Sequence, residues 1–411
     1  MPRSNSSRST TKARSSSAAP AANRSSSGDI TITKVEVTEF AYELKDIGKD
    51  YNGFFPVWEP GAVAQRRGGA LRIHTSAGII GEAIAGGASQ VAPFAEYLIG
   101  KNPLMREFLF NDIKRALRHT NNAAYGATDI ALWDIAGKVA GLPVYRLLGG
   151  YRTKLPCYAS TFHGEALEGG LNSPEAYADF AEQCLSLGYP AYKLHVWGEP
   201  PFKRDVATMH AVGKRVGDRM DLMLDGSCAY RTFHDALMVG RACDDNDFMW
   251  YEDPYSDGGI SAAGHRKLRE MLRTPLLMTE MVRGLEPKVD FIAAGGTDYV
   301  RSDLGLDGGI TGAMKIAHVA EGFGLDCEIH GCSPAARHCM AAMRNTNYYE
   351  MGLLHPKVGP MRPPVYLDGY RDELDAVDKN GCVDVPEKPG IGVGIDWRWI
   401  RQNSTGTAVW K

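Results

Sequence analysis

Acidic and imidazole side chains recur at nearly regular intervals through the middle of the chain. Each ends a short run of apolar or β-branched residues, and neighbours in the series are roughly 20 to 30 residues apart, about one βα unit. The series is His195, Asp225, Glu252, Glu280, Asp303, His330 and Glu350. A single acid after a strand is often only a helix N-cap. Seven in register indicate a shared site, because crowded like charges repel unless something compensates them.

Three consecutive members of this series have the composition of a metal site. Asp225, Glu252 and Glu280 offer oxygen ligands without sulfur. Oxygen donors suit a hard divalent cation, and Mg²⁺ fits best because it keeps positions open for water and substrate oxygens. The alternative is a structural cluster in which lysines and arginines neutralise the three carboxylates. We predict a Mg²⁺ site.

Candidate proton-transfer groups flank the three carboxylates. Lys193 and His195 would share one face of a strand, because side chains two residues apart point the same way. On the other flank, Asp303 would orient the imidazole of His330 and raise its basicity. We therefore predict removal of a proton α to a carboxylate, with the metal and the charge of Lys193 stabilising the ene-diolate. Glu350 would donate a hydrogen bond to the second oxyanion if its acidic surroundings raise its pKa enough to keep it protonated.

These residues need strands whose ends meet. Eight short apolar runs alternate with helix-length segments, as in a (β/α)₈ barrel, where all carboxyl ends of the strands meet at one mouth. The runs are 155–160, 191–195, 221–225, 248–252, 276–280, 298–303, 325–330 and 347–350. An open doubly wound sheet shows the same alternation. However, no Gly-x-Gly-x-x-Gly follows the first run, so the dinucleotide-binding version lacks its fingerprint.

A segment rich in glycine, proline and aromatic residues precedes the barrel pattern. Residues 51–69 predict a loop, followed by a hairpin over 70–84 with its turn at 76–78. With Phe54, Trp58 and Arg66 the loop suits a lid over a polar, anionic substrate. An ordinary irregular loop explains the same composition.

Further side chains near the predicted strand ends are candidates for the substrate pocket or the barrel interior. Ser227 follows Asp225 closely, and Trp197 either walls the pocket or closes a strand against a helix. Arg301 and Glu328 each lie two residues before a member of the series, so both point into the barrel. We predict that they form a buried ion pair, because two unpaired buried charges are costly.

The composition excludes several classes of protein. The 411 residues are 44% hydrophobic and 23% charged with a net charge of −3, so no basic field marks a nucleic-acid binder. No apolar run approaches the 18 or so residues of a membrane span. The eight cysteines form no Cys-x-x-Cys pair, which indicates reduced thiols of a cytoplasmic protein. Residues 1–29, rich in serine and arginine, predict a disordered tail, with a transit peptide as the alternative.

Four motifs give the chain from residue 30 onward a specific resemblance. They are Ala-Leu-Trp-Asp-Ile-Ala-Gly-Lys at 131–138, Leu-Leu-Gly-Gly at 147–150, Gly-Gly-Ile-Thr at 308–311 and Pro-Gly-Ile-Gly-Val at 389–393. Together they resemble the enolase superfamily, and within it the mandelate racemase subgroup. The resemblance implies an α/β fold, a modified TIM barrel of the (β/α)₇β type at 151–360. An α+β capping domain at 30–150 would be completed by the C-terminal segment 361–411. Family members usually assemble into dimers or octamers.

The resemblance also implies roles for individual residues. Asp225, Glu252 and Glu280 match the family's Mg²⁺ ligands, Asp303 and His330 match its acid/base dyad, and Glu350 matches its enolate-stabilising glutamate. Two positions depart from the pattern. His195 stands where the second lysine of Lys-x-Lys usually acts as the base, and Ser227 stands where many members have asparagine.

Three reactions share proton abstraction as their first step. Dehydration of a sugar acid, an aldonate or aldarate, to a 2-keto-3-deoxy acid is commonest with a His–Asp dyad and is favoured here. Racemisation or epimerisation and cycloisomerisation remain alternatives. The muconate type is disfavoured, because Asp303 stands where it needs a lysine. A silent relative that only binds a sugar acid is a further alternative, against which the complete set of ligands and bases argues.

Overall fold

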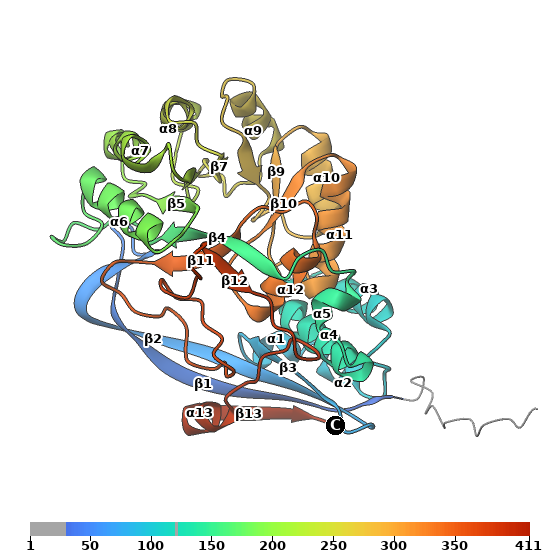
Figure 1. The fold of residues 1–411 in the computed structure, drawn as a ribbon. Coiled ribbons are helices and arrows are strands. Elements are labelled where there is room, and N and C mark those ends of the chain that lie inside the picture. The colour runs from blue at the N-terminus through green and yellow to red at the C-terminus, as the bar shows by residue number, and fades with distance from the viewer. Residues whose placement is uncertain (1–29, 120–121) are drawn as a thin grey trace, which may run out of the picture.

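The protein contains two sheets, which lie one above the other in Figure 1. A computed structural model describes residues 30–119 and 122–411, so the predicted tail lies outside the described residues. One sheet is antiparallel, with the strand order β13-β1-β2-β3. The other is a curled parallel sheet with the order β10-β9-β8-β7-β6-β5-β4-β11, which gives the (β/α)₇β type of barrel that was predicted.

The parallel strands follow the predicted runs. They are β4 (Lys154–Thr161), β5 (Ala191–His195), β6 (Asp221–Asp225), β7 (Trp250–Glu252), β8 (Leu276–Met278), β9 (Tyr299–Ser302), β10 (Asp326–Ile329) and β11 (Tyr349–Leu354). The helices between them are α6 (Pro174–Ser186), α7 (Lys203–Val216), α8 (Phe233–Asp245), α9 (Ala262–Arg269), α10 (Leu285–Ala293), α11 (Gly309–Gly322) and α12 (Pro334–Ala342). Ser173, Thr232, Ser261 and Ser333 each cap a helix by accepting a backbone N–H, which fixes where these helices begin.

Backbone and side-chain hydrogen bonds help to close the barrel between β10 and β11, the two ends of the strand order. The N–H of Cys327 donates to the carbonyl of Asn345. The carboxylate of Glu328 accepts the backbone N–H groups of Asn347 and Tyr348, at 2.9 and 3.4 Å. Because buried backbone N–H groups need partners, the Glu328 side chain does here what a neighbouring strand does elsewhere.

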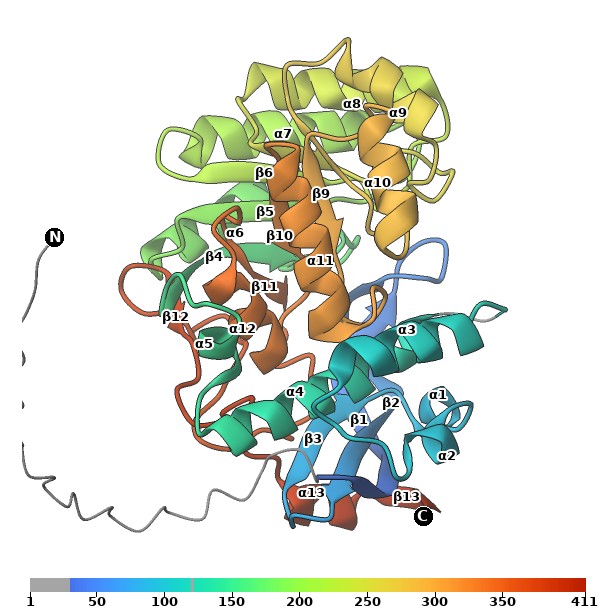
Figure 2. The same ribbon diagram turned by 90° about the vertical axis from the view of Figure 1, so that its right-hand side faces the viewer.

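The second unit is formed by residues before and after the barrel. It contains β1 (Ile32–Lys49), β2 (Pro56–Thr75), β3 (Ile80–Ala85), α1 (Ala88–Val91), α2 (Ala95–Leu98), α3 (Arg106–Ala116), a 3₁₀ turn (Asn122–Tyr125), α4 (Gly126–Ala140) and α5 (Val144–Leu147). The C-terminal segment adds β12 (Cys382–Asp384), which pairs with β4, then α13 (Trp397–Gln402) and β13 (Ser404–Trp410). In Figure 2, α4 lies between β3 and the barrel helix α11, and contacts both.

The sequence motifs meet around α4. Asp129 accepts the backbone N–H and the hydroxyl of Thr311, at 2.8 and 2.7 Å. Asp134 accepts the N–H of Ile391, and a Cβ on Gly137 would lie only 2.6 Å from the Cα of Gly390. The glycines permit this close approach of backbone to backbone. The motifs therefore join the antiparallel unit to the barrel.

The predicted loop at 51–69 is wrong. Residues 56–69 belong to β2, whose ladder with β1 runs from Lys49 opposite Pro56 to Ile32 opposite Thr75. The register shifts between Lys45 and Ile47, and the residues facing this irregularity include Gly61, whose N–H binds Asp46. A bulge of this kind accepts proline and glycine without ending the hairpin. Only the short turn before Pro56 matches the loop prediction.

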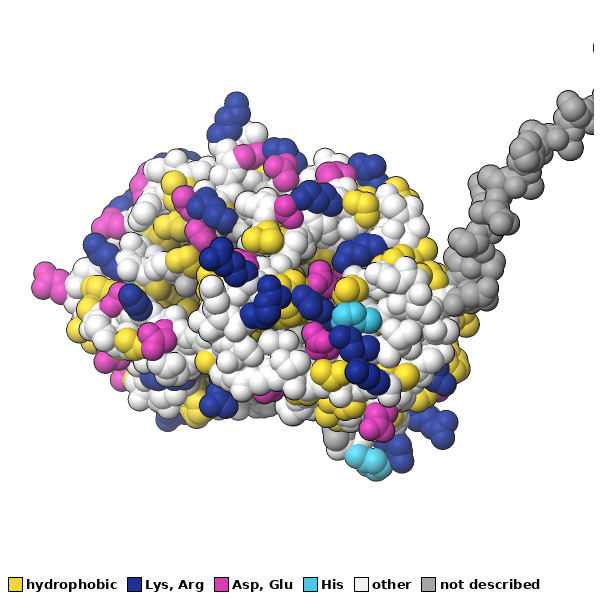
Figure 3. Space-filling view, turned by 90° about the horizontal axis from the view of Figure 1, so that it is seen from below, with side chains coloured by type: hydrophobic (Ala, Val, Ile, Leu, Met, Phe, Trp, Pro, Cys, Tyr) yellow, Lys and Arg dark blue, Asp and Glu magenta, His cyan; other side chains and the backbone are white. Residues whose placement is uncertain are grey.

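The surface mixes both signs of charge. On the face seen from below in Figure 3, lysines and arginines lie among acidic and apolar side chains. No helix within the described residues is long and apolar enough to cross a membrane. All eight cysteines are free thiols, as their spacing predicted.

Candidate active site

A cavity of about 720 Å³ opens at the carboxyl ends of the barrel strands. Its barrel wall carries polar side chains from the strand ends and the loops that follow them, among them His195, Asp225, Asp253, Glu280, His330 and Glu350. Its opposite wall comes from β1, β2 and the segment that follows the barrel. Five of the seven residues of the predicted series thus share one cavity, whereas Glu252 and Asp303 do not line it.

Sheet register brings the first acids together. His195 is the Cα partner of Asp225, and Asp225 is the partner of Glu252. Lys193, buried beneath them, donates to Glu252 at 2.9 Å and to Asp225 at 3.3 Å. The charges on Glu252 and Glu350 outweigh burial and hold the pKa of Lys193 well above its usual value. Lys193 is therefore a fixed cation beneath the strand ends.

Arg301 is the second buried cation. Its Nε and Nη2 atoms bind the two oxygens of Glu252 at 2.6 and 2.7 Å, the bidentate geometry that guanidinium prefers. A third bond runs from Nη2 to the hydroxyl of Tyr158 at 3.2 Å. Glu252 is therefore compensated on both oxygens, and it lies just below the cavity rather than on its wall.

The neighbouring carboxylates lack such compensation. Burial and the charges of Glu252 and Asp225 raise the pKa of Glu280 against the opposing charge of His330. Burial and the charges of Glu280, Glu252 and Asp225 raise the pKa of Asp253 well above its usual value. Its Oδ1 atom has no hydrogen-bond partner among the described residues. Excess negative charge therefore collects where β7 and β8 end.

Backbone strain marks the same place. Ser227, Cys228, Asp253 and Thr279 all have positive φ, between 38° and 88°. Such angles are costly for residues with a Cβ, and most of all for a β-branched threonine. Asp253 follows directly on Glu252 and Thr279 directly precedes Glu280, while Ser227 and Cys228 lie two and three residues after Asp225. Strain concentrated at these positions is typical of a functional site.

The oxygen chemistry of this rim fits Mg²⁺. Asp225, Glu252 and Glu280 lie on neighbouring strands or the loops after them, and the uncompensated charge near Glu280 and the orphaned oxygen of Asp253 favour a dication. Within residues 30–119 and 122–411, however, no three His, Cys, Asp or Glu side chains are arranged as a ready metal centre. Lys193 and Arg301 hydrogen-bond the oxygens of Glu252.

The His–Asp pair lies on the far flank. His330 Nδ1 is 2.6 Å from Asp303 Oδ2, and its Nε2 is 3.7 Å from Glu280 Oε2. Burial opposes the charge on the imidazole, but the charges of Glu280, Asp303 and Glu350 together raise its pKa to about 10. The imidazole in turn lowers the pKa of Asp303 despite burial of that carboxyl. His330 is therefore held as a cation that can give a proton.

His195 is held differently on the near flank. Its Nδ1 lies 2.8 Å from the carbonyl of Thr161, which can only accept, so Nδ1 carries a proton in this contact. Its Nε2 lies 3.0 Å from Asp225 Oδ2. Nε2 is therefore the nitrogen that can exchange a proton with a ligand in the cavity.

The expectation that Glu350 is protonated is wrong. Burial alone would raise its pKa, but Lys193, Arg301, His330 and the N–H of Gly331 hold that pKa well below its usual value. Lys193 Nζ lies 3.2 Å from one oxygen, and the Gly331 N–H donates to the other at 2.7 Å. Glu350 is therefore a carboxylate that accepts hydrogen bonds and fixes Lys193.

The predicted ion pair between Arg301 and Glu328 is also wrong. The two residues are register partners, but their charged groups do not come within ion-pairing distance. Arg301 reaches across the barrel to Glu252, and Glu328 turns toward the N–H groups of Asn347 and Tyr348. Burial raises the pKa of Glu328 to about 7 in that position.

The predicted substrate residues are scattered. Ser227 lines the cavity and donates its N–H to Asp225 at 2.8 Å. Trp197, 5% exposed, closes the strand end by donating to the carbonyl of Glu165. Trp58 packs on His355, with ring centroids 5.7 Å apart, and Phe54 is 73% exposed. None of these three is part of the cavity wall.

The hairpin also contributes to the wall, but through other residues than predicted. Phe55 and Arg67 line the cavity, whereas their predicted neighbours Phe54 and Arg66 do not. Adjacent residues of an extended chain point to opposite sides, so a segment taken for a loop gives no basis for choosing between them. His163 was missed as well. It stacks on Phe55 at 4.3 Å and lies beside His195, with ring centroids 5.1 Å apart.

The barrel and the polar residues at its mouth are typical of a barrel enzyme, and comparison with known proteins identifies the family. Residues 176–399 match the family model "Enolase C-terminal domain-like", and residues 60–149 match "Mandelate racemase / muconate lactonizing enzyme, N-terminal domain". The chain belongs to this family, the mandelate racemase and muconate lactonizing enzymes of the enolase superfamily.

Similar proteins carry out several reactions. D-glucarate dehydratase from Agrobacterium tumefaciens, solved with magnesium, superposes with a TM-score of 0.80 at 31% identity, covering 92% of this chain and 99% of that one. D-gluconate/D-galactonate dehydratase from Picrophilus torridus is 28% identical over 71% of this chain and 74% of its own length. 3,6-anhydro-alpha-L-galactonate cycloisomerase from Streptomyces coelicolor is 29% identical over 69% and 73%. Acid-sugar dehydratases, epimerases and cycloisomerases are thus among the homologues, and this chain shares the enolase-superfamily chemistry.

Proposed function

We propose that this protein is a Mg²⁺-dependent dehydratase of a sugar acid, an aldonate or aldarate, and forms a 2-keto-3-deoxy acid. One observation carries the proposal: His195 and His330 face one cavity from opposite flanks of an acidic rim, and His330 has a carboxylate partner of its own, Asp303, whereas His195 shares Asp225 with Lys193. A base on one side and an acid on the other are what elimination requires.

The proposed division of labour follows from these environments. Mg²⁺, held by Asp225, Glu252 and Glu280, would stabilise negative charge on the substrate carboxylate. His195 Nε2 takes the α-proton, so the C–H electron pair moves into the developing double bond. His330 gives its proton to the β-hydroxyl, which leaves as water, and the enol then becomes the 2-keto acid. Lys193 remains protonated and stabilises negative charge near the carboxylate.

Other parts of the chain would support this chemistry. In the proposal, residues 151–360 form the catalytic barrel, and 30–150 with 361–411 form the cap that closes its mouth. Phe55, Ser227 and His163 line the space that the substrate would fill. Closure of this kind excludes water and strengthens the electrostatic interactions inside.

A panel of mono- and dicarboxylic sugar acids, incubated in D₂O with and without Mg²⁺, tests the proposal. Proton NMR should show loss of the α-proton and appearance of the 2-keto-3-deoxy product only with Mg²⁺. Exchange of the α-proton without loss of water would instead identify a racemase or epimerase, which the placement of one imidazole on each flank also permits. No exchange with any acid would overturn both and leave a silent relative.

A further inference from the structure

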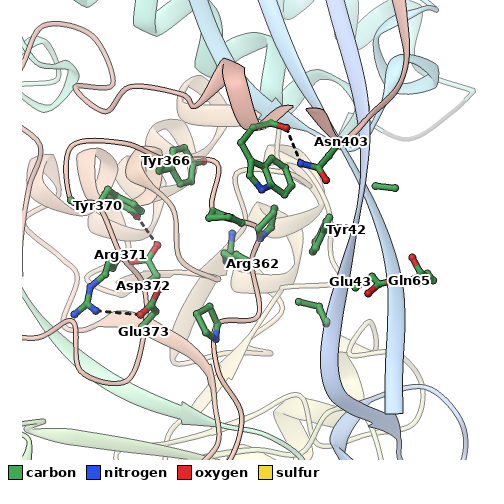
Figure 4. Close-up of a pocket in the computed structure, with 17 residues that line it drawn as sticks. Tyr42, Glu43, Gln65, Arg362, Tyr366, Tyr370, Arg371, Asp372, Glu373 and Asn403 are labelled. Carbon is green, nitrogen blue, oxygen red and sulfur yellow. Dashed lines mark hydrogen bonds and ion pairs between the residues drawn. The ribbon is translucent and has the colours of Figure 1, made fainter. Parts of the chain in front are cut away.

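A second set of polar groups lies on the wall of the cavity that comes from outside the barrel. Tyr42, Arg362 and Tyr366 line the cavity and also a larger outer cavity of about 940 Å³, so they stand between the two. In Figure 4, Arg362 lies between Tyr42 and Tyr366. A Cβ placed on Gly331, the residue after His330, would lie 4.0 Å from Arg362 Nη2. The guanidinium is thus beside the catalytic rim.

These three groups are donors without partners. The guanidinium of Arg362 and the hydroxyls of Tyr42 and Tyr366 make no hydrogen bond or ion pair with any residue that the structure describes. Nearby arginines behave otherwise: Arg337 binds Asp372 at 2.7 Å, and Arg371 binds Glu373 and Asp375. Arg362 therefore differs from these arginines in having no direct ion pair with a described residue, although nearby Cys332 and Asp372 raise its pKa.

The two sides of the cavity differ in their charge balance. On the barrel side, acids outnumber the buried cations Lys193 and Arg301. On the opposite side, the cavity wall carries Arg362 and Arg67, and the acids of the lining all belong to the barrel side. A guanidinium binds a carboxylate through two parallel hydrogen bonds, and phenolic hydroxyls add further donors. The donor wall therefore has the composition of a carboxylate site.

Building on the dehydratase proposal, we propose that Arg362, with Tyr42 and Tyr366, binds the second carboxylate of a dicarboxylic sugar acid. The substrate is then an aldarate rather than an aldonate. One carboxylate would lie at the acidic rim and the other at the donor wall, with the hydroxylated carbons between them. The terminal CH₂OH of an aldonate would leave the guanidinium without an anion, which makes it the poorer ligand.

Two measurements test this, and they separate its failure from failure of the dehydratase proposal. Turnover is compared for six-carbon aldarates and the matching aldonates, in the wild type and in Arg362→Gln. Binding is measured by calorimetry with adipate and hexanoate, which have no hydroxyl to eliminate. The matched control is Arg371→Gln, which removes a paired arginine of the same segment that lines the outer cavity but not the cavity at the strand ends.

We expect wild type to prefer aldarates, and Arg362→Gln to lower kcat/KM for aldarates by about 10- to 100-fold, as for loss of a charged hydrogen bond. Arg362→Gln should lower aldonate turnover much less than aldarate turnover, and Arg371→Gln should turn over both acids as wild type does. Adipate should bind more weakly to Arg362→Gln than to wild type. A wild-type preference for aldonates, or equal losses for both acids, would overturn the role of Arg362. If no sugar acid reacts but adipate still binds through Arg362, only the dehydratase proposal fails.

Discussion

His195 and His330 stand on two flanks of one barrel mouth, but the protein holds them in different ways. His195 binds a backbone carbonyl through Nδ1 and shares Asp225 with Lys193. His330 binds its own carboxylate, Asp303, and its side chain is 37% exposed, compared with 9% for His195. One imidazole is fixed by groups that also serve the acidic rim, whereas the other has a dedicated partner.

The residues two positions before the two histidines, one layer deeper in the barrel, also differ in their contacts. Two residues before His195, Lys193 points inward and joins Asp225, Glu252 and Glu350. Two residues before His330, Glu328 turns away to close the barrel. The near flank therefore concentrates charged groups below the cavity, whereas on the far flank the residue below the histidine hydrogen-bonds the backbone that closes the barrel. This teaches that equivalent strand positions need not carry equivalent functions.

Replacing each histidine in turn should show this difference between the two flanks most clearly. We expect His195→Asn and His330→Asn each to lower kcat/KM for dehydration by roughly 10⁴-fold, at the upper end of general acid–base contributions. The two variants should differ in D₂O. His330→Asn should still exchange the α-proton, because the base is intact, and His195→Asn should not.

Circular dichroism and thermal melts of both variants serve as controls for folding. Loss of exchange in both variants would contradict the assignment of His195 as the sole base. Exchange that depends on the substrate's α-configuration in each variant would instead indicate racemisation, with one imidazole acting on each face.

A smaller loss is expected when the partner of His330 is changed. Asp303→Asn keeps the side-chain shape but removes the charge that raises the pKa of the imidazole. We expect kcat/KM to fall by roughly 100-fold, at the lower end of the acid–base range. The alkaline limb of its pH profile should move to lower pH. An unchanged profile would show that Asp303 does not set the protonation of His330.

Much of the acidic rim could be predicted because burial and spacing act together. Strands with both faces covered read as short apolar runs, so Ala191–His195 and Asp221–Asp225 were predicted with their observed bounds. A polar residue at the end of such a run has one place to go, the barrel mouth. Shared register then brought His195 beside Asp225.

What could not be predicted depends on reach and on distant chain segments. The alternation of side chains predicts which face of the strand Arg301 occupies. It does not predict that the long Arg301 side chain reaches Glu252, or that Glu328 hydrogen-bonds the backbone where the barrel closes. Arg362 lies outside every strand and carries no periodic signal. His163 follows the first barrel strand, where the series of strand-end residues has no member. The glycine and proline of residues 59–62 concealed a strand, because a bulge removes their cost.

The titration of His330 gives a more direct measure of its surroundings. Without metal, the pKa of His330 is expected near 10, raised from 6.5 mainly by Glu280 against the effect of burial. Its stabilisation of the fold is then complete below about pH 6.5 and is lost as the pH rises through 10. NMR of the imidazole resonances, assigned with His330→Asn, measures this value.

Adding Mg²⁺ should lower this pKa, because a dication on Glu280 cancels the charge that raises it. Glu280→Gln should lower it too, and Mg²⁺ should then have little further effect. A pKa that Mg²⁺ leaves unchanged in the wild type would argue against Glu280 as a ligand.

The smallest effect is expected beneath His330, where Glu328 closes the barrel. Its pKa of about 7 is raised from 4.5 by burial, so ionising it costs stability as the pH rises from 4.5 to 7. Glu328→Gln cannot ionise and should lose less stability than wild type between pH 5 and pH 8, by up to about 2 kcal/mol, the cost of an imperfectly bonded buried group. Urea unfolding at both pH values measures the difference, with the surface variant Glu321→Gln as control. If stability falls equally with pH in wild type and Glu328→Gln, Glu328 stays ionised and its bonds to Asn347 and Tyr348 fully offset the cost of burial. The two flanks of the mouth would then be more alike than their contacts indicate.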